Sequence, residues 1–225
     1  MPASIRASGI DDTYPRLRDA ILHGQYMPNE RLVETELART LDSGRAAIRT
    51  ALARLEQDGI VTREPFRGAR VRAISESEAV EILEARAVLE GLSVRYAARN
   101  ATDQDIAALC VILNTMRERF TEGDLLGVSE GNSHLHQRLL YISRHQTAAR
   151  LIDGLQAQNV RYQFRTILVP GRAPRSLEEH GWIVDAVAAH DADAAETAMR
   201  LHLAHVADAL RQTRSTSSDR MATLT

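Results

Sequence analysis

The stretch Glu34–Arg72 constrains the fold of this 225-residue chain more than any other part of its sequence. Its apolar residues recur at helical spacing in two short segments, 34–41 and 45–58, which a polar turn separates. Gly59 follows the second segment, and glycine is common just beyond the end of a helix. Two short β-type runs then flank a Pro-Phe-Arg-Gly tip, which predicts a hairpin. The order of these elements predicts a helix-turn-helix with a wing.

The second of these helices has one apolar face and one arginine face. Four residues share a stripe about 100° wide that should pack inward: Ile48, Ala51, Leu52 and Leu55. Arg45 and Arg49 lie one turn apart on the opposite face. A helix of this kind can enter the major groove of DNA, where arginine contacts guanine or phosphate. A helical hairpin with a solvated arginine face is the alternative, and periodicity alone leaves both open.

Other residues of this region are further candidates for DNA contact. Arg67 lies at the predicted wing tip, from which it can reach the minor groove or the backbone. The small side chains of the second helix allow a close approach to the bases. The remaining candidates are Ala46, Ala47, Thr50 and Gly68.

Residues 73–213 show helical periodicity and no strand pattern. Ser75-x-x-Glu78 and Ser176-x-x-Glu179 are predicted capping boxes that open helices, and Thr102 is predicted to cap another. The expected helices are about 76–100, 102–122, 124–143, 146–168, 176–189 and 192–213. The predicted fold is therefore mainly α: an N-terminal winged helix-turn-helix followed by an all-α helical bundle. The domain prediction is a polar tail at 1–12, the winged domain at 13–72, the bundle at 73–213 and a second polar tail at 214–225.

Composition limits the function classes. No apolar run is long enough to span a membrane, and no secretory signal opens the chain, so we expect a cytoplasmic protein. Arginine slightly exceeds acidic residues in the N-terminal part, whereas acidic residues exceed arginine in the rest. That sign suits a DNA-binding N-terminal domain. The single cysteine, Cys110, lies in an apolar run and is predicted to be buried packing.

Three histidines of the C-terminal part fall on the apolar stripes of their helices, so they should point inward: His136, His180 and His202. Asn132 precedes His136 by one helical turn and shares its face. Three inward imidazoles and an amide oxygen in a bundle core can bind a divalent metal. Three separate core histidines with hydrogen-bonded rings are the alternative. Glu90 and Glu179 are expected to be solvated or to cap helices.

Arginines near these histidines are candidates for the anionic end of a ligand. They are Arg86, Arg161 and Arg165. An ordinary surface or ion-paired arginine is the alternative for each of them.

The N-terminal residues resemble the winged helix of the GntR family of bacterial regulators. The matching motifs are Pro28-Asn29-Glu30-Arg31-Leu32, Leu37-Ala38-Arg39-Thr40-Leu41, Gly44-Arg45-Ala46-Ala47-Ile48-Arg49 and Arg67-Gly68-Ala69-Arg70-Val71. The resemblance implies that Arg45, Arg49 and Arg67 bind DNA. The chain departs from the family at Gly44, where a hydroxyl residue is usual, and at the pair of alanines that follows Arg45.

Residues 75–213 look like the helical FCD effector domain of the FadR-like branch of that family. The matching residues are Arg86 to Glu90, Asn132 to His136, Glu179-His180 and His202. The resemblance implies a divalent metal, Zn²⁺ or Ni²⁺, bound by the three histidines and Asn132, with a small carboxylate beside it. The family has aspartate where this chain has Asn132, and a neutral ligand balances less of the metal's charge.

These expectations describe a metabolite-responsive transcriptional regulator, a repressor rather than an enzyme. It should bind a palindromic operator as a homodimer and respond to a small organic acid. A metal-dependent enzyme that uses the three histidines is one rival. A helical dimerisation module with a purely structural metal is the other.

Overall fold

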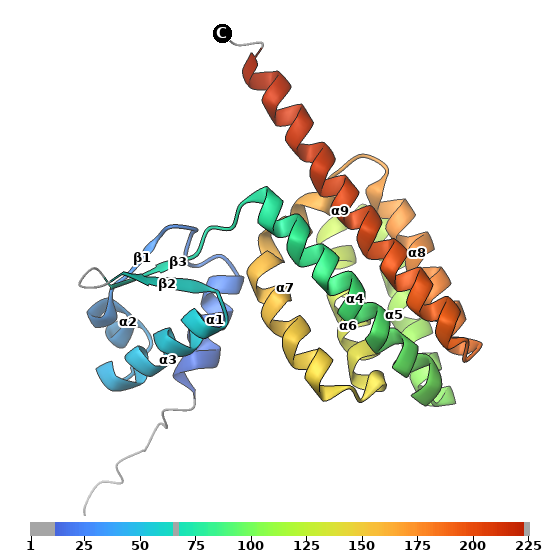
Figure 1. The fold of residues 1–225 in the computed structure, drawn as a ribbon, viewed down its shortest axis with the longest axis horizontal. Helices are drawn as coiled ribbons and strands as arrows, with labels where there is room; N and C mark the ends of the chain where they lie inside the picture. The colour runs from blue at the N-terminus through green and yellow to red at the C-terminus, as the bar shows by residue number, and fades with distance from the viewer. Residues whose placement is uncertain (1–11, 65–67, 223–225) are drawn as a thin grey trace, which may run out of the picture. The chain divides into compact units, whose positions relative to one another are not determined.

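The computed structural model describes residues 12–64 and 68–222, and the chain divides into two compact units, Met1–Ile74 and Ser75–Thr225. The N-terminal unit contains three helices: α1 (Thr13–Leu22), α2 (Glu34–Thr40) and α3 (Arg45–Gln57). Its strands are β1 (Arg31–Leu32), β2 (Val61–Glu64) and β3 (Gly68–Val71), which form an antiparallel sheet in the order β1-β3-β2 (Figure 1).

The core of the N-terminal unit explains its local structure. The predicted stripe of α3 is confirmed, because Ile48, Ala51, Leu52 and Leu55 are all buried. Leu17 of α1 and Leu32 of β1 are buried as well, and together these residues form part of the apolar core of the unit. Gly44 precedes α3 in an extended conformation and supplies no side-chain cap. The three-stranded sheet and the α2–turn–α3 arrangement confirm a winged helix-turn-helix.

The wing begins its return strand at Gly68, whose φ of +87° is a conformation that L side chains rarely adopt. Gly68 pairs with Glu64 across the hairpin, and Val71 pairs with Val61 at the other end. Residues 65–67, where the sequence predicts the wing tip, lie outside the described part of the chain.

The C-terminal unit consists, in its described part, of helices α4 (Glu76–Asn100), α5 (Asp103–Thr121), α6 (Leu125–Ser143), α7 (Gln146–Ile167), α8 (Arg172–Ala188) and α9 (Ala192–Ala222). Ser75 caps α4 by accepting a hydrogen bond from the Glu78 amide, as predicted. Thr102 and Asp105 form a complete capping box at α5. Figure 1 shows α4 and α9 side by side, and the two helices pack closely along their length. The predicted all-α bundle is confirmed.

The helix boundaries differ from the prediction at α8 and α9. Helix α8 begins at Arg172 rather than Ser176, because Gly171 turns the chain with φ +77° and Pro174 is tolerated in a first turn. Ser176 and Glu179 therefore lie inside the helix and form no capping box. Helix α9 continues to Ala222, beyond the expected end at 213. Extending a formed helix is much easier than nucleating one, so a polar segment can continue it.

The prediction that Cys110 is buried is wrong. Cys110 is exposed on α5, because Leu109, Leu113 and Met116 take the inward positions of that helix. On α4, Val88 is 52% exposed. Within the described residues, no helix is long and apolar enough to cross a membrane.

Candidate functional site

Helix α3 presents its arginines to solvent. Arg45 is exposed in the first turn, and the Arg49 side chain is 63% exposed. The Arg49 Nε donates to a carboxylate oxygen of Glu34 on α2 over 2.8 Å. The Thr50 hydroxyl donates to the Ala46 carbonyl one turn earlier, over 3.1 Å. Both candidate arginines therefore lie on the face opposite the buried stripe, with Arg49 held by an ion pair.

The remaining DNA candidates have different surroundings. Ala46 is exposed and Ala47 is half-buried. Their small side chains project little from the surface of α3 near its first turn. Gly68 is exposed at the start of β3. Arg67 lies outside the described residues. The positions of Ala46, Ala47 and Gly68 are compatible with DNA contact, which stays a prediction for these residues and for Arg67.

Three histidines meet inside the C-terminal unit. His136 comes from α6, His180 from α8 and His202 from α9, and all three are buried. A ring nitrogen of each lies within 4.8 Å of the others, and the two Nε2 atoms of His136 and His180 are 3.4 Å apart. The predicted inward orientation is confirmed. We call these three residues the histidine cluster.

Glu90 of α4 orients the first histidine of the cluster. Its Oε2 lies 2.5 Å from Nδ1 of His136, and its Oε1 accepts from Nε of Arg86 over 2.7 Å. Burial alone would raise the pKa of Glu90, but the charges of Arg86 and His136 lower it to about 2. An ionised carboxylate only accepts hydrogen bonds, so Nδ1 of His136 carries the proton. Nε2 of His136 then faces the cluster, 3.4 Å from Nε2 of His180.

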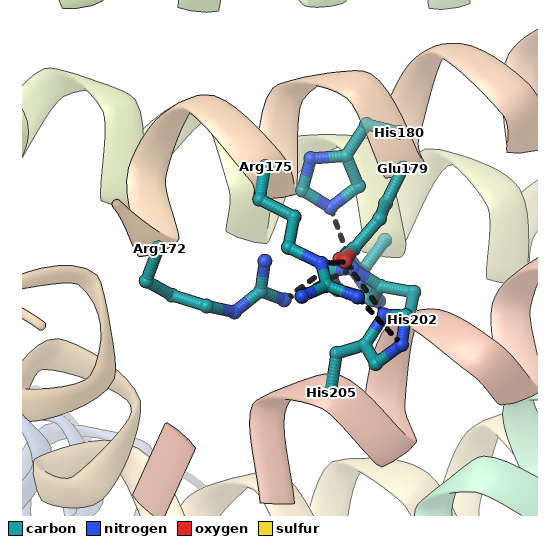
Figure 2. A network of polar contacts seen from close by, with 7 residues as sticks. Arg172, Arg175, Glu179, His180, His202 and His205 are labelled. Carbon is teal, nitrogen blue, oxygen red and sulfur yellow. Dashed lines mark hydrogen bonds and ion pairs between the residues drawn. The ribbon is translucent and has the colours of Figure 1, made fainter. Parts of the chain in front are cut away.

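Glu179 of α8 plays the corresponding role for His202 (Figure 2). Its Oε2 accepts from Nδ1 of His202 and from Nη2 of Arg172, each over 2.8 Å. Its Oε1 accepts from Nδ1 of His205 over 2.7 Å and pairs with Arg175 at 3.3 Å. Glu179 is only 1% exposed, so a single buried carboxylate joins a cluster histidine to three other charged or polar groups, Arg172, Arg175 and His205.

The cluster has the chemistry of a metal site. Burial, together with the charges of neighbouring groups, holds the pKa values of His180 and His202 well below their usual range. Both rings are therefore neutral near neutral pH and can donate lone pairs. Ligands at about 2.0–2.1 Å from a tetrahedral Zn²⁺ lie roughly 3.4 Å apart, which matches the His136–His180 separation. The two carboxylate–histidine pairs are the outer partners that orient imidazole ligands in metal sites.

A cavity of about 50 Å³ opens beside the cluster. Asn132, His136 and His202 all line it, so the cavity brings the predicted amide ligand to the same space as two cluster histidines. Arg86 lines it too, although the Arg86 side chain is buried and paired with Glu90. The side chains of Arg161 and Arg165 lie outside the described residues. Metal ligation by Asn132 and ligand binding by the three arginines stay predictions.

Comparison with known proteins decides the family. Residues 81–205 match the FCD domain, and residues 10–71 match the family described as bacterial regulatory proteins, gntR family. The chain belongs to the GntR family. Its C-terminal unit is an FCD domain. The chain is 28% identical over 206 residues to the HTH-type transcriptional repressor RspR of Escherichia coli K12, covering 92% of this chain and 90% of RspR.

A further relative agrees with this assignment, and solved structures share the fold. The Nta operon transcriptional regulator of Aminobacter aminovorans is 31% identical to this chain over 139 residues. The aligned residues cover 61% of this chain and 64% of that regulator. The fold is similar to E. coli McbR/YncC, with a TM-score of 0.77 at 20% identity over 91% of this chain and 98% of that one. The structure of a GntR regulator from Rhodococcus sp. RHA1 gives a TM-score of 0.69 at 23% identity, covering 90% of this chain and 97% of that one. This GntR-family chain is a transcriptional regulator and not an enzyme.

The sequence did not predict several residues of the FCD site. Glu90 and Glu179, expected to be solvated or to cap helices, are instead buried partners of cluster histidines. The sequence pattern does not single out two buried residues that line the cavity: Asn159 is 1% exposed and Arg172 is 6% exposed. Glu90 follows Arg86 by four positions, and a charged i,i+4 pair inside an apolar helix face was the available signal for it.

Proposed function

We propose that this GntR-family chain is a metabolite-responsive repressor that binds a palindromic operator as a homodimer. A small organic acid and a divalent metal, Zn²⁺ or Ni²⁺, bind in the FCD domain and change the affinity for DNA. The observation that carries the proposal is the pairing of an exposed arginine face on α3 with a buried histidine cluster beside a cavity. The first suits a reader of DNA and the second suits a receptor for a small ligand.

Support for DNA recognition comes from the geometry of α3. Arg45 and Arg49 stand on its solvent face, while the opposite face is buried in the unit. A recognition helix needs this division, because one side must rest on the scaffold while the other contacts base edges. Two such units related by a twofold axis would each read one half of a palindrome. The centres of the two half-sites would lie about 10 base pairs apart, or a multiple of that spacing. The relative RspR is named a repressor, which supports the direction of control.

Support for a ligand-responsive FCD domain comes from the cavity. Its lining combines apolar residues such as Leu83 and Val206 with a few polar groups, the usual composition of a small-molecule site. The cluster offers neutral imidazoles to a metal, and Arg86 offers positive charge to an anion. A ligand that binds one arrangement of the protein more tightly than another shifts the population, and with it the affinity for DNA.

The test measures binding of purified protein to its own promoter DNA by fluorescence anisotropy. Arg45→Ala combined with Arg49→Ala should weaken operator binding by about 100-fold or more, since each guanine contact is worth about 1–3 kcal/mol. The free energy of unfolding should change by less than about 0.5 kcal/mol, because both side chains are exposed. Arg99→Ala combined with Arg150→Ala removes the same charge from exposed positions of the FCD domain and should leave affinity nearly unchanged. Equal affinity for the wild type and the α3 variant would overturn the proposal.

A further inference from the structure

A second pocket opens on the FCD domain, apart from the cavity beside the histidine cluster. It has a volume of about 410 Å³ and lies between the start of α8 and one side of α9. We call it the outer pocket. Its wall includes five polar residues: Arg172, Arg175, His205, Asp208 and Gln212. Arg172 lines the cavity as well, whereas the other four line the outer pocket and not the cavity.

The charges around the outer pocket leave a positive surplus. Glu179 is a single carboxylate that pairs with Arg172 at 2.8 Å and with Arg175 at 3.3 Å (Figure 2). Asp208, the acidic residue of the described wall, pairs with Arg211 of its own helix at 2.7 Å. Two guanidinium groups beside the pocket therefore share one counter-charge, and an anion in the pocket would balance the second positive charge.

The buried arginine of this wall lacks an acceptor. Arg172 is only 6% exposed, and its Nη1 has no hydrogen-bond partner in the described part of the protein. Burial lowers the pKa of Arg172, the charge of Glu179 opposes this shift, and the charge of Arg175 adds to it. The two arginines therefore repel each other while they share Glu179. An anion beside them would give Nη1 an acceptor and would weaken that repulsion.

The second arginine is exposed and held in place. The Arg175 side chain is 57% exposed, and its Nη2 lies 3.0 Å from Nε2 of His205 on α9. Its contacts with Glu179 and His205 restrain the guanidinium in the pocket wall, so less freedom is lost when an anion binds. A guanidinium donates paired hydrogen bonds to the oxygens of phosphate or carboxylate groups.

The start of α8 favours phosphate among these anions. Gly171 and Arg172 are the N-cap and the first residue of this 17-residue helix, and both lie in the pocket wall. Gly171 supplies no side-chain acceptor to the first amide groups of the helix. The N-terminus of a helix combines unpaired amide groups with partial positive charge, which suits the several oxygens and double charge of phosphate.

We propose that the outer pocket binds a phosphate group, either inorganic phosphate or the phosphate end of a small metabolite. Arg175 and Arg172 contact its oxygens, and the first amide groups of α8 face it. The open volume leaves room for an organic group attached to the phosphate. This site goes beyond the proposed function, because it lies outside the cavity and requires neither the metal nor the organic acid.

Isothermal titration calorimetry of the full chain with inorganic phosphate tests the site. The protein is first freed of metal with a chelator and dialysed, so that phosphate cannot bind through a metal ion. Sodium chloride at equal ionic strength is the blank. We expect a dissociation constant of about 1 mM or lower, and acetate should bind at least about tenfold more weakly. Glycerol 3-phosphate distinguishes the two sources: tighter binding than inorganic phosphate indicates a phosphorylated metabolite, and weaker binding indicates the free ion.

Three variants locate the phosphate in the outer pocket. Arg175→Gln should weaken binding by about tenfold, because it removes the exposed guanidinium. Gln212→Glu adds a negative charge at an exposed position of the wall and should weaken binding by about fivefold. Asp208→Asn removes a negative charge and should strengthen binding by about threefold, a gain that a folding defect cannot imitate. Arg150→Gln is the matched control at an exposed position of α7 and should change the affinity by less than about twofold.

Several results would overturn the inference. They are no phosphate binding at millimolar concentration, equal affinity in the wild type and Arg175→Gln, no gain in Asp208→Asn, and acetate that binds as tightly as phosphate. Circular dichroism melting curves establish that each variant is folded. None of these results affects the proposed function, because the titration contains neither DNA nor metal. A chain that binds phosphate as expected but not its promoter would refute the proposed function alone.

Discussion

The recognition helix α3 and the histidine cluster place their charged groups in opposite environments. The Arg49 side chain is 63% exposed and its partner Glu34 is 28% exposed. Glu90 and Glu179 are each 1% exposed, and their arginine partners are nearly as buried. Water screens the first pair, whereas the second group of charges must be balanced within the protein. The winged helix can therefore change its binding residues at little cost in stability, and the FCD site cannot.

The largest effect is expected from a substitution in the buried charge network of the FCD domain. Glu179→Gln keeps the volume of the side chain but leaves Arg172 buried without its counter-charge. Removing one partner of a buried pair costs about 3–5 kcal/mol, so we expect the free energy of unfolding of the FCD domain to fall by that amount. Urea unfolding followed by the fluorescence of Trp182 measures it, because Trp182 is the single tryptophan and lies in α8.

Glu178→Gln is the matched control, since Glu178 precedes Glu179 on the same helix and is exposed. The control should change the free energy of unfolding by less than about 0.5 kcal/mol. If Glu179→Gln were as stable as the control, the network in Figure 2 would be a surface-like set of weak pairs. The contrast between the two units would then disappear.

The same contrast explains what could be predicted from the sequence. The buried stripe of α3 and its arginine face follow from residue spacing within one helix, and the spacing correctly predicts a buried Ile48 and an exposed Arg49. The inward direction of the cluster histidines follows in the same way. The residues that orient them do not, because Glu90 lies 46 positions before His136 and Glu179 lies 23 positions before His202. Local spacing assigns a residue to a face but does not identify its distant partner.

The misplaced start of α8 shows how a local pattern misled. Ser176-x-x-Glu179 has the composition of a capping box, but a capping carboxylate would be at the surface. The structure instead extends α8 back to Arg172, which buries Glu179 and brings Arg172 to it. The tertiary gain from satisfying His202 and Arg172 together therefore outweighs the local preference. The sequence does not single out Arg172 and Asn159, because their environment exists only in the folded bundle.

An intermediate effect is expected from the exposed ion pair of the winged helix, Glu34 with Arg49. Glu34 holds Arg49 through a surface ion pair, which is worth at most about 1 kcal/mol. Glu34→Gln frees Arg49 and removes a negative charge that repels phosphate. We expect affinity for non-operator DNA to rise by up to about fivefold, with unchanged stability. Fluorescence anisotropy at two salt concentrations measures the change. Glu36→Gln, on the same helix and exposed, is the control for net charge. A fall in operator affinity would show instead that Glu34 positions Arg49 for reading a base.

The smallest effect is expected at Tyr14 of the N-terminal unit. Its side chain is half-buried, so its exposure lies between that of Arg49 and that of Glu179. Its hydroxyl donates to Asp58 over 2.5 Å, and Arg54 stacks over its ring at 3.9 Å. Burial, followed by the hydrogen bond to Asp58 and the charge of that carboxylate, raises the pKa of Tyr14 from 10.0 to about 12. The protonated hydroxyl is thus favoured in the folded protein.

The raised pKa fixes the sign of the pH dependence. The stability that Tyr14 contributes is fully present below pH 10, the pKa of the unfolded chain, and is lost as the pH rises through about 12. At neutral pH, Tyr14→Phe should lower the free energy of unfolding by at most about 1 kcal/mol, because solvent screens a half-exposed hydrogen bond. This difference from the wild type should shrink above pH 10 and vanish near pH 12. Circular dichroism melting curves measure it, with Tyr141→Phe at a 72% exposed position as the control. A difference that stays constant across this range would mean that the hydrogen bond to Asp58 contributes nothing to stability, and that Tyr14 acts only through its ring and Arg54.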